Sequence, residues 1–163
     1  MTRTALGPAR PAILAADPGA KAGACLLFPP PVAGGRGHVG ARAEAWPVRG
    51  ADPRAVWTRV LAAQHAGAGV LVVEWPRRRT RDRASWASLG TMFERAAYWV
   101  AAARIAGYDT IVRVDPAEWQ RATGAVSPAM RFALARSVGV ETASIDAASA
   151  ACMALWYERE EEE

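Results

Sequence analysis

The sequence is 163 residues long, is 52% hydrophobic and carries a formal net charge of +4. This length suits one domain with a sizeable core, and the hydrophobic content excludes disorder over most of the chain. No apolar run of about eighteen residues is present, so we predict no membrane-spanning helix. Residues 1–11 lack the apolar segment of a signal peptide and are expected to form a loose tail.

The body of the chain is more basic than its net charge suggests. Residues 1–157 carry 19 Lys and Arg against 11 Asp and Glu, a net charge of +8, and residues 158–163 form an acidic tail. A basic body favours a polyanionic partner. Cys25 and Cys152 lie in apolar surroundings without a CxxC partner or a nearby His, which predicts neither a disulfide nor a zinc site. The expected compartment is therefore a reducing cytoplasm.

The hydrophobic pattern predicts alternating strands and helices. In chain order they are strands at 12–17, 22–28 and 42–48, a helix at 52–66, a strand at 69–75, a helix at 85–106, a strand at 110–114, and helices beginning at Pro116, Pro128 and near Ser144. The continuous apolar run at 69–75 is typical of a central parallel strand. Pro47 cannot donate to a sheet ladder and marks its strand as an edge strand. The order predicts one layered α/β domain at 12–157.

Three acids stand at positions that the core would otherwise fill. Asp17 ends the first strand, Glu74 ends the fourth, and Asp146 lies in the first turn of the last helix. Singly, each has a structural explanation: a turn cap, a partner for a following arginine, or a favourable charge at a helix N-terminus. Together they lie where a mixed sheet brings them close, because sites in open α/β sheets form at the ends of central strands.

Carboxylates that close together repel one another unless a cation intervenes. Carboxylate oxygens suit Mg²⁺ or Mn²⁺, and two such ions about 4 Å apart can activate water and stabilise the leaving oxygen of a phosphodiester. We therefore interpret Asp17, Glu74 and Asp146 as metal ligands.

Three motifs carry a resemblance to a known family. The stretches "ILAADPGAKAGACLLF", "VLVVEWP" and "DAASAACMAL", in this order, resemble the RuvC-type Holliday junction resolvases of the RNase H-like superfamily, over about residues 12–157. The resemblance implies an RNase H-like mixed five-stranded sheet flanked by helices. It also implies a homodimer that uses Mg²⁺ or Mn²⁺ to place paired nicks in branched DNA, with Asp17, Glu74 and Asp146 as catalytic residues.

The last helix departs from the family pattern, which has two acids three residues apart. Here the pair reads Asp146 and Ser149. Ser149 is a neutral and weak ligand. Either the site works with three acids, with Ser149 acting through a bound water, or the activity is impaired.

Several basic and aromatic residues are candidate DNA contacts. A loop of arginines directly follows Glu74, and we expect these cations to clamp phosphates, the alternative being a solvated charged loop. Lys21, in the first turn, is placed to reach a phosphate, and Trp75 to stack on an unpaired base. The resemblance puts Arg131 near a family lysine that contacts the scissile region. The loop arginines are Arg77, Arg78, Arg79, Arg81 and Arg83.

The sequence therefore predicts a metal-dependent, structure-selective DNA endonuclease. The alternative is a catalytically weakened relative that binds branched DNA without efficient cleavage, which Ser149 favours. An actin-like or sugar-kinase-like ATPase also begins with an Asp-x-Gly turn. It needs a second phosphate loop and a much longer chain, so this reading is disfavoured.

Overall fold

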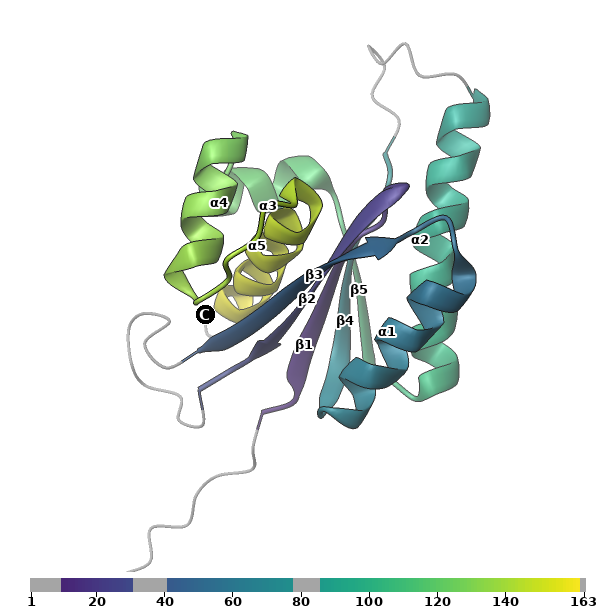
Figure 1. Cartoon of the computed structure of the whole chain (residues 1–163), viewed down its shortest axis with the longest axis horizontal. Coiled ribbons are helices and arrows are strands. Elements are labelled where there is room, and N and C mark those ends of the chain that lie inside the picture. The colour runs from purple at the N-terminus through teal and green to yellow at the C-terminus, as the bar shows by residue number, and fades with distance from the viewer. Residues whose placement is uncertain (1–9, 31–40, 78–85, 162–163) are drawn as a thin grey trace, which may run out of the picture.

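The computed structural model describes residues 10–30, 41–77 and 86–161, and of Trp86 only the backbone. In these residues five strands form one sheet with the order β3-β2-β1-β4-β5 (Figure 1). The strands are β1 (Ala12–Asp17), β2 (Lys21–Phe28), β3 (Arg42–Arg49), β4 (Ala68–Glu74) and β5 (Thr110–Val114), and the helices are α1 (Pro53–His65), α2 (Trp86–Ala106), α3 (Pro116–Thr123), α4 (Pro128–Ser137) and α5 (Ile145–Glu160).

The predicted mixed sheet is confirmed. β1, β2 and β3 pair antiparallel, whereas β1, β4 and β5 run parallel, so β4 is a central parallel strand and β3 an edge strand. Asp52 caps α1 by accepting from the backbone N–H of Arg54 at 2.9 Å. Gly67 and Gly107, with φ of +99° and +82°, follow α1 and α2 as the sequence pattern predicts.

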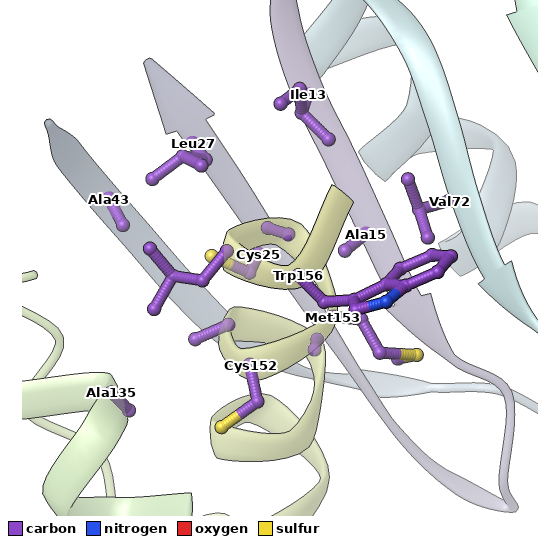
Figure 2. Packing of buried hydrophobic residues seen from close by; sticks show 14 of the residues in the cluster. Ile13, Ala15, Cys25, Leu27, Ala43, Val72, Ala135, Cys152, Met153 and Trp156 are labelled. Atoms are coloured by element: carbon purple, nitrogen blue, oxygen red, sulfur yellow. The ribbon is translucent and has the colours of Figure 1, made fainter. Parts of the chain in front are cut away.

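Helices cover both faces of the sheet. α1 and α2 lie on one face, and α3, α4 and α5 lie on the other (Figure 1). Side chains alternate between the two faces along each strand. Ile13 and Ala15 of β1 therefore join the core beneath α5, whereas Leu14 and Ala16 join the core beneath α1 and α2. Figure 2 shows Ala15 and Val72 of the sheet facing Met153 and Trp156 of α5.

The helix α5 is buried on nearly all sides. It packs against the sheet and against α4, and its residues from Ala147 to Trp156 are all buried. This explains why the sequence is apolar around the whole helix instead of along one stripe. The helix continues to Glu160, and Glu158 is buried, so the first three residues of the predicted acidic tail are helical. The division of the chain into a domain at 12–157 and two tails stays a prediction.

No helix among the described residues combines the length and apolar character needed to cross a membrane. Cys25 and Cys152 are buried and unpaired.

One glycine sets the position of α5. Gly23 of β2 lies opposite Asp17 of β1 in the sheet. A Cβ atom at Gly23 would lie 2.0 Å from the carbonyl carbon of Asp146, which is closer than any real contact. The first turn of α5 therefore rests directly on the backbone of β2, beside the end of β1.

We expect Gly23→Ala to lower the free energy of unfolding by about 1–3 kcal/mol, because the added methyl group forces α5 away from the sheet. Urea denaturation measures this change. Gly90→Ala is the matched control, since Gly90 lies in α2 with open space around its Cβ position. It should stabilise the protein by about 0.5–1 kcal/mol. Equal stability of Gly23→Ala and the wild type would contradict the close approach.

Candidate metal centre

The sheet brings Asp17 and Glu74 to the same edge and the same face. β1 and β4 are parallel neighbours, and Ala16 pairs with Val73, so the two acids end adjacent strands side by side. Alternation along each strand turns both acids toward α5, because Ala15 and Val72, two residues earlier, belong to the core beneath that helix.

Asp146 reaches this edge from α5. Ser144 caps the helix, its Oγ accepting from the backbone N–H of Ala147 at 3.2 Å. The first turn of α5 contacts Gly23 of β2, which is paired with Asp17 of β1. This contact holds Asp146 beside Asp17. The structure therefore brings together the three acids that the sequence singles out. Their role as metal ligands and catalytic residues stays a prediction.

Burial raises the pKa of all three carboxyl groups, and neighbouring acids raise those of Asp17 and Glu74 further. The pKa of Asp17 is raised well above its usual value by burial first, and then by the negative charges of Glu74 and Asp146. Burial also raises the pKa of Glu74, although a hydrogen bond from Trp119 and the charge of Arg131 oppose this. The pKa of Asp146 is raised by burial and lowered by a backbone hydrogen bond, Lys21 and Arg131. Ionisation of all three carboxyl groups at once is therefore unfavourable in the folded protein.

Trp119 and Arg131 contact this acidic cluster from α3 and α4. Trp119 Nε1 donates to Glu74 Oε2 at 2.9 Å. The Arg131 guanidinium stacks over the Trp119 ring, with its Cζ 5.3 Å from the ring centroid. Arg131 Nη1 donates to Ser149 Oγ at 3.3 Å, and Ser149 lies close enough to Asp17 to lower the pKa of its carboxyl group. Ser149 thus links the arginine to the most strongly perturbed acid.

The donor set of this site consists of oxygens. Within residues 10–30, 41–77 and 86–161, no three His, Cys, Asp or Glu side chains are grouped closely enough to hold a metal ion by themselves. Mg²⁺, however, binds proteins through one or two carboxylates and completes its shell with water and substrate phosphate oxygens. Mutually repelling carboxylates at the end of a sheet fit such a shared site, and they do not form a closed cage.

The predicted DNA contacts lie in different surroundings. Lys21 is exposed at the start of β2 and is close enough to lower the pKa of Asp146. Arg77 is exposed and forms an ion pair with Asp115 at 3.2 Å. Trp75 is partly buried, with Arg113 stacked 4.3 Å from its ring centroid and Phe93 in edge contact. The predicted contacts Arg78, Arg79, Arg81 and Arg83 lie outside the described residues.

Sequence reasoning missed three neighbours of the acids. Asp115 comes directly after β5, much as Asp17 and Glu74 stand at the ends of β1 and β4, and its charge also raises the pKa of Glu74. Its position at the end of a predicted strand could have identified it from the sequence. Trp119 carries no such signal, because its contact depends on how α3 packs. Arg49 pairs with Lys21 across β2 and β3, and the two line a hollow of about 560 Å³ that reaches Asp146.

We expect Asp17→Asn to be more stable than the wild type at pH 8 in the presence of a chelator. Because its folded-state pKa is raised, Asp17 takes up its proton more readily in the folded protein, and its stabilising effect is lost as the pH rises above the usual carboxyl pKa. Urea denaturation at several pH values should show the gain shrinking toward pH 4.

The matched control is Asp109→Asn, which removes an exposed carboxylate before β5. A variant Asp17→Asn that is equally or less stable than the wild type at pH 8 would contradict this description of the acidic cluster.

The comparisons with known proteins identify the fold. No protein-family model matches the sequence, and no curated protein matches it significantly. Thermus thermophilus RuvC superposes with a TM-score of 0.59 at 17% identity, over 93% of this chain and 97% of that one. The same protein in complex with a Holliday junction substrate gives a TM-score of 0.59 at 17% identity, over 93% of this chain and 96% of that one. The yeast mitochondrial Holliday junction resolvase gives a TM-score of 0.52 at 13% identity, over 94% of this chain and 80% of that one. The mixed sheet and its helices therefore have the RNase H-like fold of RuvC, as the sequence resemblance predicts.

Proposed function

We propose that this protein is a metal-dependent, structure-selective DNA endonuclease that nicks four-way junctions. One observation carries the proposal: Asp17, Glu74 and Asp146, three acids far apart in the sequence, are brought together at the ends of β1 and β4 and the first turn of α5, where Glu74 and Asp146 raise the pKa of Asp17. Structural neighbours that include a resolvase with its junction substrate support the choice of branched DNA.

Mg²⁺, or Mn²⁺ in its place, would neutralise the carboxylates and the scissile phosphate and favour ionisation of the attacking water. The hydrolysis breaks one P–O bond and leaves a phosphate monoester and a hydroxyl group. Asp17 and Asp146 would hold the cation, and Glu74, which accepts a hydrogen bond from Trp119, would orient the water. Because each acid comes from a different element of the rigid sheet and α5, the site is positioned before DNA arrives.

Basic side chains flank the acids where a DNA strand would approach them. Lys21 and Arg49 lie on one side of Asp146, where they line the hollow that reaches it. Arg77 lies three residues after Glu74, the last residue of β4, and further arginines follow it in the sequence. Phosphates bound by these cations place the scissile bond over the acids, and such binding weakens as the salt concentration rises.

We further propose that two chains act together. α2 exposes Met92 and Phe93, neighbours in its second turn, with 45% and 37% of their surface accessible. Pairing of α2 with its symmetry mate would cover this apolar surface and would set two sites on opposite strands of one junction. The two free, buried cysteines suit a reducing cytoplasm.

A second candidate function is binding without cleavage. Ser149 is 1% exposed and accepts a hydrogen bond from Arg131, and its neutral hydroxyl offers a metal no charged contact. The same fold and basic surface would then recognise branched DNA with little hydrolysis.

The purified protein should nick a labelled four-way junction symmetrically in Mg²⁺ or Mn²⁺, and not in EDTA, with little nicking of linear duplex. Asp17→Asn should lower the rate by at least about 100-fold, because a ligand of the cation is lost. Denaturing gel electrophoresis measures the nicks. Tight junction binding without nicks would support the second candidate, and no preference for the junction would contradict both.

We expect Trp119→Phe to slow cleavage about tenfold, because a hydrogen bond to a charged group is worth about 1.5–3 kcal/mol. The loss of this donor also raises the pKa of Glu74, so the acidic limb of the pH–rate profile should move to higher pH. Trp57→Phe, in α1 on the other face of the sheet, is the matched control. An unshifted profile would show that Trp119 only packs.

A further inference from the structure

Arg131 is held at the acidic cluster by contacts on several sides. Its Nε donates to the carbonyl oxygen of Ala125 at 3.2 Å, its Nη1 donates to Ser149 Oγ at 3.3 Å, and its guanidinium stacks over Trp119. Its backbone carbonyl accepts from Cys152 Sγ at 3.6 Å, which fixes α4 against α5. An arginine anchored in this way cannot swing out freely to follow a DNA strand, and it cannot lose its proton.

The charge of Arg131 reaches every acid of the cluster. It lowers the pKa of Asp17, Glu74 and Asp146, whereas Lys21 acts on Asp146 from the exposed side. Arg131 also donates to Ser149, which lies close enough to Asp17 to lower the pKa of its carboxyl group. The resolvase pattern has a fourth acid at the position of Ser149. Here that position holds a neutral hydroxyl group that accepts a hydrogen bond from Arg131.

The count of charges limits how many ions this site can hold. One guanidinium and one divalent cation together balance the three carboxylates Asp17, Glu74 and Asp146. Asp115, whose charge also reaches Glu74, is already paired with Arg77, and Lys21 adds a further positive charge near Asp146. A second divalent cation would leave the site strongly positive and would stand near Arg131 without an acid at position 149 to offset it.

We propose that Arg131 is a built-in cation of the carboxylate site that takes the place of a second divalent ion, so that each chain binds a single one. The inference rests on the proposed function and specifies its metal requirement. Arg131 is then a positioning residue, which acts on the acids through charge and through Ser149.

Mn²⁺ binding without DNA tests this role, with free Mn²⁺ followed by electron paramagnetic resonance. The wild type should bind one Mn²⁺ per chain. Arg131→Gln should bind it about tenfold more tightly, because a nearby positive charge is gone. Arg131→Lys keeps the charge and should stay within about twofold of the wild type. Arg136→Gln, on the exposed side of the same helix, is the matched control and should leave binding unchanged.

If Arg131→Gln fails to fold, the number of ions bound by Ser149→Asp alone, which keeps Arg131, decides the question. The added carboxylate would pair with Arg131, so this variant should still bind one Mn²⁺, whereas Ser149→Asp combined with Arg131→Gln should bind two. The inference is overturned by two ions in the wild type or in Ser149→Asp, by unchanged or weaker affinity in Arg131→Gln, or by no Mn²⁺ binding at all.

Failure of this inference can be told from failure of the proposed function. Metal-dependent nicking by a wild type that binds two Mn²⁺ leaves the endonuclease in place and removes only the role of Arg131. A wild type that neither binds Mn²⁺ nor nicks the junction removes both.

Discussion

The burial of Asp17 among other acids is the constraint on which the rest of the site depends. A carboxylate taken out of water is costly unless it is paired or bound to a cation. Here the cost is increased by Glu74 and Asp146, and Arg131 and Ser149 offset part of it. The fold holds these groups together because the edge is built from two parallel strands and a helix that cannot move apart without opening the core. Repulsion between buried carboxylates is characteristic of functional sites, and it favours the binding of a cation that neutralises their negative charge.

The geometry of the edge depends on α5. Its small residues and the missing side chain at Gly23 let its first turn rest on β2, which sets Asp146 beside Asp17. The same helix presents Ser149 one turn later, where α4 brings Arg131 against it. A single buried helix therefore carries both an acid of the cluster and the link to its fixed cation, so packing and chemistry cannot be varied independently in this part of the chain.

The strands, their order along the chain and the acids at their ends could be predicted from the sequence, because alternation and strand-end position are local patterns. Asp115 directly follows a predicted strand, so its place near the other acids could have been predicted in the same way. Trp119 and Arg131 are different: their contacts with Glu74 and Ser149 arise from the packing of α3 and α4 over α5, which no local pattern encodes. The resemblance puts Arg131 near a family lysine that contacts the scissile region, and its role as a DNA contact stays a prediction. The structure adds that its guanidinium is anchored by Ala125 and Ser149.

The central claim is that these acids form one site whose repulsion a divalent cation relieves. Thermal unfolding of the wild type and of Asp17→Asn, each with Mn²⁺ and with EDTA, tests it most directly, because an ion that binds only the folded state raises the melting temperature. The account predicts that Mn²⁺ stabilises the wild type and leaves Asp17→Asn nearly unchanged. An equal shift in both proteins, or no shift in the wild type, would contradict it.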